Sequence, residues 1–592
     1  MLEKINKKIV PNNVVNDLIK LYNKNEFLQI LEKEKQLVSL YQDSIDILNI
    51  FGSTNLALQN YKKAITNFNK AIRINPNVPT IYYNLGLAYH HIGNMDDAIE
   101  SYKKAIDLKP DYDEAFCNMG MSLEEKGDPE GAIEKYKKVL EINPKHPGAH
   151  MNLGNSYVLC GDYNSAIKNY KTAISNDKGK YNFLGGLLFA VNYSPDISAE
   201  DIFEYYKLYD QRFGLPHKHK WKPFAQPKVP NKKLKIGYVS PDFKKHSIER
   251  FLLPTLAHHN HDKFEIFAFA DLKKSDLISL KYKSYVDHWI RTDGMKDDEL
   301  VQKIRSLGID ILVDLAGHTR NNRLSIFAQK PAPISLTWLG FGYTTGLSAI
   351  DYFLTDKVMA PKGSEHLFSE KLWQLKNHAF CCYKAQVNMD RITTLSALSK
   401  GFITFGTLTR TIRINDRVIK AWADILIKVP NSKLIINSKN FYNNEKTIIN
   451  FIQKFKDHGI SEHRLDFYYK TPPWDSMRQI DIALDCFPHN SGTTLIEHLY
   501  MGNPFITYSN RPSVGKIGAS ILTTLGHPEW IATSEQEYVE KAVALASDPQ
   551  KLSTIRQNLR AEMEASPLMD QKGFVRELEE AYQAMWKKWC ST

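Results

Sequence analysis

Apolar residues in the first third of the chain recur every three or four positions, as on one face of a helix. This pattern itself repeats every 34 residues, and each unit contains two such amphipathic stretches. Four columns of small, aromatic or helix-ending residues keep the same step: Gly52, Gly86, Gly120 and Gly154; Ala64, Ala98, Ala132 and Ala166; Phe68, Tyr102, Tyr136 and Tyr170; and Pro76, Pro110 and Pro144. The pattern predicts pairs of helices that pack closely at the small residues and end at the prolines.

The period and its columns are typical of tetratricopeptide repeats, which stack into an α-solenoid because neighbouring units bury each other's apolar faces. Four clear units cover residues 45–180, and a degenerate repeat is expected within the N-terminal helices of residues 1–44. Asn84, Asn118 and Asn152 precede the repeat glycines on the first helix of each pair. Their amides are suited to bind the backbone of an extended acceptor peptide. Peptide binding, spacing and homodimerisation all remain open for the solenoid.

From about residue 181 the 34-residue pattern stops. Residues 181–231 predict a helical connector followed by a linker rich in Pro and Lys. Short apolar runs such as "KIGYVS" and "DILVDL" then alternate with amphipathic helices over residues 232–390, and the alternation restarts over residues 391–592. This predicts two Rossmann-like halves with largely parallel sheets, whose carboxyl strand ends face a shared cleft.

Composition and charge restrict the kinds of partner that we expect the protein to bind. At 592 residues the chain needs several domains, and 43% hydrophobic with 24% charged residues is typical of globular proteins. The net charge of +11 comes from scattered lysines, so we expect no nucleic-acid partner. We expect no membrane association, because no apolar run is long enough to span a bilayer and no secretion signal is visible. The six cysteines lack metal-ligand spacing and predict reduced thiols in the cytoplasm.

Common nucleotide, hydrolase and zinc motifs are absent from the sequence, which has no Walker motif, no G-x-S-x-G and no H-E-x-x-H. The loops expected at strand ends instead gather His, Arg, Asn, Thr and Gly, which suits a diphosphate better than a metal ion. One such loop, "HNSGTT" (489–494), lies between an apolar strand and a helix. Its hydroxyls either cap the helix or hold a phosphate together with the helix amides.

Several long stretches carry a family resemblance, among them "KIGYVSPDFKKHS", "DILVDLAGHTRNNRLSIFAQKPAPISLTWLG" and "DIALDCFPHNSGTTLIEHLYMGNPFIT". With the repeats, they make the chain similar to the tetratricopeptide-linked O-GlcNAc transferases and their Spindly relatives, glycosyltransferase family 41, and in particular to bacterial-type members. The resemblance implies a GT-B fold and an inverting sugar transfer without metal or other cofactor. It also implies a nucleotide-sugar donor held mainly by the second half.

The resemblance further implies roles for individual residues. His246 matches a histidine proposed as catalytic base or substrate-positioning group, and His318 is a second cleft candidate for positioning. Arg413 corresponds to a phosphate-binding Lys of relatives and is expected to stabilise the departing diphosphate. The other implied donor-binding residues are Arg410, Ser491, Gly492, Thr493, Thr494, Glu497 and Lys516, of which Glu497 matches a ribose-binding carboxylate.

The chain departs from the family pattern at three places. Lys516 stands where relatives usually carry Arg, and Phe341, Gly342 and Tyr343 stand where a Tyr-Pro pair is common. The Arg410–Arg413 segment also differs from the animal and plant pattern. Two of these places concern phosphate and base contacts, so the departures bear on which donor is used.

The main hypothesis is therefore a protein O-glycosyltransferase that moves GlcNAc from UDP-GlcNAc to Ser or Thr of proteins recruited by the repeats. GDP-fucose and UDP-glucose are alternative donors on the same fold. A non-catalytic scaffold, in which the repeats recruit partners and the second region is degenerate, is the remaining alternative. His246, Arg413 and the Ser-Gly-Thr-Thr loop favour the enzyme, because all are present in usable form.

Overall fold

The computed structural model describes residues 10–177, 183–382, 392–442 and 444–592. It divides into two compact units, Met1–Gly186 and Leu187–Thr592. The predicted boundaries at residues 180/181 and 390/391 both lie outside the described residues. Among the described residues, no helix is both long enough and apolar enough to cross a bilayer.

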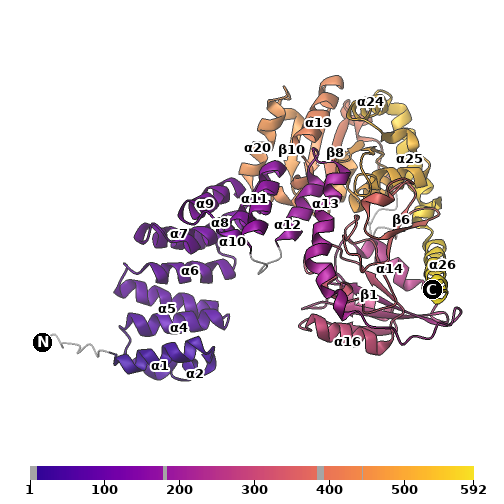
Figure 1. Ribbon diagram of the computed structural model, residues 1–592. Helices are drawn as coiled ribbons and strands as arrows, with labels where there is room; N and C mark the ends of the chain where they lie inside the picture. The colour runs from indigo at the N-terminus through magenta and orange to yellow at the C-terminus, as the bar shows by residue number, and fades with distance from the viewer. Residues whose placement is uncertain (1–9, 178–182, 383–391, 443) are drawn as a thin grey trace. The chain divides into compact units, whose positions relative to one another are not determined.

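The first unit consists of stacked helix pairs, as the 34-residue pattern predicts (Figure 1). The four pairs are α4 (Ile45–Ala57) with α5 (Tyr61–Ile74), α6 (Pro79–His91) with α7 (Met95–Leu108), α8 (Asp113–Lys126) with α9 (Pro129–Ile142), and α10 (Pro147–Cys160) with α11 (Tyr163–Asn176). Three shorter helices precede them: α1 (Asn12–Asn23), α2 (Phe27–Glu32) and α3 (Glu34–Leu40). In the degenerate repeat the second helix is thus split in two, while Leu18 and Ile30 still pack on α4 through Ile47 and Phe51.

The glycine and aromatic columns contact each other inside each helix pair. A Cβ added at Gly86 would lie 2.6 Å from the Tyr102 ring, and one at Gly120 would lie 2.6 Å from the Tyr136 ring. Both rings are fully buried. Only glycine lets the first helix of the pair approach the ring this closely, which explains why the two columns share one period.

The second unit begins at Leu187, inside the predicted connector, so most of the connector belongs to this unit. The connector contains α12 (Leu184–Tyr193), α13 (Ala199–Tyr209), the π-helical turn η1 (Asp210–Gly214) and the 3₁₀ helix η2 (Leu215–Lys220). Two hydrogen bonds attach the Pro- and Lys-rich linker to the α/β fold. The Trp221 indole N–H donates to the Ala328 carbonyl at 2.8 Å, and the Trp586 indole donates to the Val229 carbonyl at 2.9 Å.

The first Rossmann-like half contains a parallel sheet of seven strands in the order β3-β2-β1-β4-β5-β6-β7. Its strands are β1 (Leu234–Ser240), β2 (Phe264–Ala270), β3 (His288–Arg291), β4 (Ile311–Asp314), β5 (Ile334–Thr337), β6 (Tyr352–Asp356) and β7 (Lys371–Leu375). The helices between them are α14 (Glu249–Ala257), α15 (Leu277–Ser284), α16 (Asp297–Leu307), α17 (Leu324–Phe327) and η3 (Glu365–Leu367). All residues of β4, β5 and β6 are buried, as expected for central parallel strands covered on both faces.

The second half repeats this topology in a six-stranded sheet of order β10-β9-β8-β11-β12-β13, again with parallel pairings. Its strands are β8 (Thr404–Leu408), β9 (Lys433–Asn437), β10 (Leu465–Tyr468), β11 (Ile482–Leu484), β12 (Phe505–Tyr508) and β13 (Ile531–Ala532). Its helices are α18 (Ser396–Lys400), η4 (Thr411–Arg413), α19 (Asp416–Lys428), η5 (Lys439–Phe441), α20 (Glu445–Lys456), η6 (Glu462–Arg464), α21 (Trp474–Gln479), α22 (Thr493–Tyr500), α23 (Ile517–Leu525), η7 (Pro528–Trp530), α24 (Glu535–Ala546), α25 (Pro549–Ala565) and η8 (Pro567–Met569). The two short edge strands β7 and β13 have no counterpart among the predicted strands.

The last helix, α26 (Gln571–Cys590), corrects the predicted extent of the second half. Its apolar face packs into the core of the first half, where Phe574, Leu578, Tyr582 and Trp586 join residues of β1, β2 and β4. Figure 1 shows this yellow helix beside the magenta elements of the first half. The chain therefore crosses back, and residues 391–592 are not confined to one half.

Candidate functional site

The two sheets place their topological switch points opposite each other. In each sheet the strand order reverses between two central strands, β1 and β4 in the first and β8 and β11 in the second. Ligands of open α/β sheets bind at this point, outside the carboxyl ends of the strands. Here the loops after β1, β5, β8 and β11 line one cavity of about 460 Å³. The cleft predicted between the two halves is therefore a real cavity.

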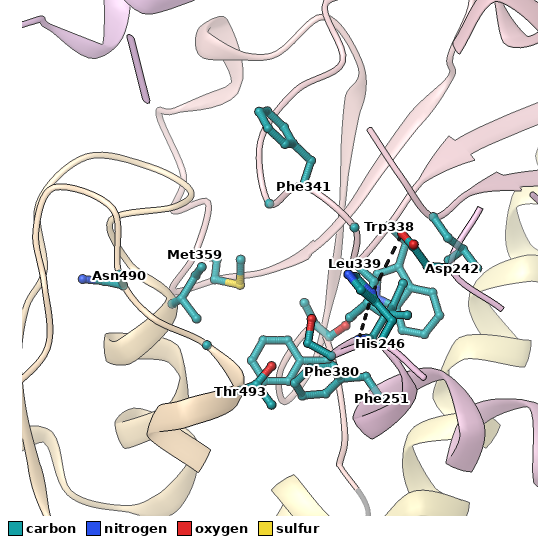
Figure 2. Close-up of a pocket in the computed structure, with 18 of the residues that line it drawn as sticks. Asp242, His246, Phe251, Trp338, Leu339, Phe341, Met359, Phe380, Asn490 and Thr493 are labelled. Atoms are coloured by element: carbon teal, nitrogen blue, oxygen red, sulfur yellow. Dashed lines mark hydrogen bonds and ion pairs between the residues drawn. The ribbon is translucent and has the colours of Figure 1, made fainter. Parts of the chain in front are cut away.

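The first half supplies a largely apolar wall. Phe251, Trp338, Leu339, Met359 and Phe380 line this side (Figure 2). Phe251 and Phe380 meet edge to face at 5.2 Å, and the Trp338 indole N–H donates to the Ala379 carbonyl at 2.7 Å. Because these rings pack on each other and the indole N–H has its hydrogen-bond partner, this side of the cavity has a fixed shape.

His246 lines the cavity from the loop that follows β1. Its ring is loosely held, because Nδ1 lies 3.4 Å from the Ile248 amide and 3.9 Å from the Asp242 carboxylate. The side chain is 44% exposed, so it remains accessible to a substrate. Figure 2 shows His246 and Asp242 on one side of the cavity and Asn490 on the other. A histidine in this position can contact a hydroxyl that enters the cavity.

The loop between β11 and α22 forms the polar side of the cavity through Asn490, Gly492, Thr493 and Thr494. Helix α22 begins at Thr493 with Gly492 as its N-cap residue, and no side chain caps it. Of the two predicted roles of this loop, the hydroxyl cap does not form, and the ligand site is the one that remains. Ser491 does not line the cavity, but its Oγ is buried without a hydrogen-bond partner. The amides of this helix end are available to an anion.

Two arginines follow β8 and also line the cavity. Arg410 is exposed, whereas Arg413 is partly buried at the end of η4. The Arg413 Nε is buried without a hydrogen-bond partner. A buried guanidinium N–H left unpaired is costly, so this position favours an anionic ligand.

A second cavity of about 280 Å³ adjoins the first and shares Arg410, Arg413 and Thr494 with it. It lies at the carboxyl ends of β8, β9 and β10, within the second half. Lys439 and Lys470 add positive charge, and Tyr469 adds an aromatic ring. None of these three residues was predicted from the sequence. If a phosphate of a ligand binds at Arg413, the part of the ligand attached to that phosphate can extend into this second cavity.

Asp485 holds the loop that forms the anion site, and it was also not predicted from the sequence. One carboxylate oxygen accepts hydrogen bonds from the amides of Cys486 and Ser491, both at 2.8 Å, and the other accepts from the Thr507 hydroxyl at 2.8 Å. Burial raises the pKa of Asp485 to about 7, although these hydrogen bonds and nearby Arg413 oppose the shift. Asp485 therefore ties the start of the loop to β12.

Asp314 makes hydrogen bonds of the same types in the first half. It accepts from the amides of Ala316 and Gly317 and from the Thr337 hydroxyl at 2.8 Å. The sequence carries a signal for both positions, since "IDILVD" (309–314) and "IDIALD" (480–485) share the pattern I-D-I-x-x-D. In both, the first aspartate also accepts from the strand alongside, through Lys235 and Thr404. An internal comparison of the two halves would have found the pair.

We expect Asp485→Ala to weaken UDP binding about tenfold, because buried N–H and O–H groups left unpaired cost about 1–3 kcal/mol and loosen the loop. Asp485→Asn should retain most of the affinity, since its oxygen can still accept from both amides while its NH₂ faces Thr507. Calorimetric titration with UDP measures both. Asp314→Ala is the matched control: it should lower the melting temperature without changing UDP affinity. Equal loss of affinity in both alanine variants would contradict a specific role for Asp485.

The pKa of Asp485 also sets a pH dependence. The pKa rises from its ordinary value of 3.8 to about 7 on folding, so the folded state holds the proton more tightly. The contribution of the protonated Asp485 carboxyl to the free energy of unfolding is therefore fully present below about pH 4, and it is lost as the pH rises toward 7. Asp485→Asn lacks this loss, so its stability relative to the parent should increase across that pH range in urea denaturation. A constant difference between the two proteins would contradict the raised pKa.

The structure does not bring all implied donor residues to the cavity. His318 lies outside its lining; its Nε2 bonds the Thr345 carbonyl at 2.7 Å, and burial lowers its pKa to about 4. Lys516 also lies outside, donates to the Ser509 hydroxyl at 3.0 Å, and has a pKa lowered by burial. Their donor roles stay predictions.

Glu497 makes an ion pair with Arg250 of α14, 3.4 Å from its Nε, and so joins the two halves. Burial raises the pKa of Glu497, and Arg250 opposes this. It lines a small neighbouring cavity with Thr493 rather than the main one. Ribose binding by Glu497 would require the ion pair to open, and this role also stays a prediction.

The asparagine column of the repeats forms contacts between successive units. The amide of Asn84 donates to the Ser53 hydroxyl at 3.4 Å, and that of Asn118 donates to the Tyr83 hydroxyl at 3.0 Å. Asn152 contacts the Cys117 sulfur at 3.6 Å. All three side chains remain partly exposed. They are therefore oriented by the preceding repeat, and peptide binding through them stays a prediction.

Comparison with known proteins agrees with this architecture. The family described as "Glycosyl transferase family 41" matches residues 206–400 and 392–578, and tetratricopeptide repeats match residues 52–93, 79–112, 122–161 and 147–179. A curated relative from Solanum lycopersicum, "Probable UDP-N-acetylglucosamine--peptide N-acetylglucosaminyltransferase SPINDLY", is 34% identical over 68% of this chain and 44% of its own length. The relative of similar name, SEC, from Arabidopsis thaliana is 31% identical over 64% of this chain and 40% of its own length. The chain thus spans less than half the length of these curated relatives.

Among solved structures, a variant of the Thermobaculum terrenum O-GlcNAc transferase is similar to this protein. It shares 27% identity and a TM-score of 0.77, covering 87% of this chain and 98% of its own. At 87% coverage the match extends over both units of this chain. The two Rossmann-like halves of the second unit form a GT-B fold. By sequence match and fold, the chain belongs to glycosyl transferase family 41.

Proposed function

We propose that the protein is an inverting, metal-independent protein O-glycosyltransferase that moves GlcNAc from UDP-GlcNAc to Ser or Thr of proteins bound by its repeats. The observation that carries the proposal is the Arg413 Nε, which is buried without a hydrogen-bond partner in a cavity that is also lined by the uncapped start of α22. An incoming diphosphate would accept hydrogen bonds from Arg413 and from the amides of this helix end. The names of the relatives, which specify UDP-N-acetylglucosamine and a peptide, support this donor and acceptor.

In this proposal Arg413 and the α22 amides hold the leaving diphosphate. Negative charge grows there as the bond to the sugar breaks, and preorganised donors stabilise that charge most when water is excluded. Arg410 adds a second positive charge at the mouth shared by the two cavities. The nucleoside would extend into the second cavity beside Lys470 and Tyr469.

In this proposal the acceptor hydroxyl displaces the diphosphate from the sugar in one step. Asp242 is the only carboxylate among the described residues that line the cavity. The same scarcity supports the absence of a divalent cation, which prefers several oxygen ligands. No cluster of three potential metal ligands occurs among the described residues. His246 would position the acceptor hydroxyl or accept its proton.

The repeats would recruit the acceptor protein through Asn84, Asn118 and Asn152, and homodimerisation through them remains a second use. The cytoplasm remains the predicted compartment, and the cysteines among the described residues are all free thiols, which supports it.

A panel of nucleotide sugars tests the proposal directly. Purified protein is titrated calorimetrically with UDP, GDP, UDP-GlcNAc, UDP-glucose and GDP-fucose, and hydrolysis is followed in parallel. We expect UDP-GlcNAc to bind and to be hydrolysed fastest, in buffer containing EDTA as well. If the protein instead prefers GDP-fucose or UDP-glucose, that nucleotide sugar replaces UDP-GlcNAc as the proposed donor. Binding of none of the five would favour the non-catalytic scaffold.

A further inference from the structure

A tyrosine of the connector reaches the donor cavity from outside both Rossmann-like halves. Tyr193, the last residue of α12, stacks on the ring of His489 with centroids 4.5 Å apart and planes within 10°. Tyr193 is 4% exposed, and His489 lines the main cavity next to Asn490. Through Tyr193 the connector thus contributes to the site an aromatic ring that stacks directly on a residue of the cavity.

Arg511 fixes this end of α12 to the second half. Its guanidinium donates to the backbone carbonyls of Asn192, Ser194 and Ile197, the latter two at 3.0 and 3.2 Å. The C-terminal carbonyls of a helix lack partners within the helix, so a cation here satisfies them and complements the helix dipole. Arg511 lies in the loop after β12, within the same half as His489. The stacking partner of His489 is therefore held in place by several hydrogen bonds.

The environment of His489 defines what the ring can offer a ligand. Its Nδ1 lies 3.0 Å from the Asn490 carbonyl, which can only accept, so Nδ1 carries the proton and Nε2 is an acceptor. Burial lowers the pKa of His489 well below its usual range, and Arg413, Arg511 and Arg410 lower it further. A neutral ring with a free acceptor atom suits an O–H or N–H donor of a sugar rather than a phosphate.

We propose that His489 contacts the sugar of the donor and that Tyr193 is the positioning residue that fixes its ring. The inference rests on the proposed function and deepens it, because it names the part of the donor that this wall recognises. Arg413 and α22 bind the diphosphate, so loss of the stack affects the sugar and leaves the diphosphate site intact. Tyr193 acts through His489 and does not itself need to touch the substrate.

The test compares UDP with UDP-GlcNAc on the full chain. In Tyr193→Leu we expect the Kd and KM for UDP-GlcNAc to rise about five- to tenfold, the loss typical of one aromatic pair, with kcat for hydrolysis nearly unchanged. The Kd for UDP should stay within about twofold of the parent. Tyr193→Phe keeps the ring and should restore parental values, and His489→Leu should reproduce the sugar-specific loss.

Tyr209→Leu is the matched control. Tyr209 is also a buried connector tyrosine, and its ring contacts His318 at the same centroid distance of 4.5 Å, but His318 does not line the cavity. It should lower the melting temperature without changing either affinity. Equal weakening of UDP and UDP-GlcNAc in Tyr193→Leu, or no weakening of either, would overturn the inference. A parent protein that binds neither ligand would instead overturn the proposed function, and this inference with it.

Discussion

Arg413→Ala should lower kcat for donor hydrolysis about 10²–10³-fold, the loss typical of removing one preorganised charge-stabilising donor. The reason is that the diphosphate gains charge as the sugar leaves, and the Arg413 Nε is already buried with no partner in the protein. The ground-state affinity for UDP should fall less than kcat, because the charge on the diphosphate is greater in the transition state. Steady-state hydrolysis and calorimetry on the same preparations separate the two effects.

Two variants define the role of Arg413. Arg413→Lys should recover part of the rate, since a point charge remains although bidentate bonding is lost. Arg417→Ala is the matched control, because Arg417 lies four residues later, at the start of α19, but donates to the Pro195 carbonyl at 3.2 Å and does not line the cavity. It should turn over like the parent. If Arg413→Ala binds UDP and hydrolyses the donor like the parent, the phosphate site is not at this segment.

A fragment of residues 181–592, which lacks the repeats but retains all of α12, should lose glycosylation of protein acceptors by about 10²-fold or more at low acceptor concentration. That magnitude is typical of losing one of two linked binding sites, because the repeats raise the effective concentration of the acceptor at the cleft. Donor hydrolysis should be unchanged, since every cavity residue lies beyond residue 240. Intact-mass measurement of modified protein, beside nucleotide release, reads out both.

Short Ser- and Thr-containing peptides are the control for this experiment, because they are too small to occupy repeats and cleft together. The fragment should modify them as well as the full chain does. A milder change, Asn84, Asn118 and Asn152 all to Ala, should raise KM for protein acceptors more than it lowers kcat, because these contacts do not change in the transition state. Equal protein glycosylation by the fragment and the full chain would refute recruitment by the repeats.

The sequence by itself determined the repeats, the alternating strands and most of the cavity loops. The 34-residue step locates every helix pair because each unit packs only on its neighbours, so its contacts are local and periodic. Buried parallel strands are equally visible, since they read as continuous apolar runs. His246, Arg410, Arg413 and the loop at Gly492 follow such runs, and all four line the cavity as their positions after strands imply.

Only the tertiary structure decided which side chains meet across long stretches of chain. Asp485 reaches Thr507 on another strand, and Glu497 pairs with Arg250 of the other half, 247 residues earlier. Helix α26 returns to the first core, and Tyr193 of the connector stacks on His489. Local periodicity carries no information about such pairs, because sheet order and the packing of the halves set them.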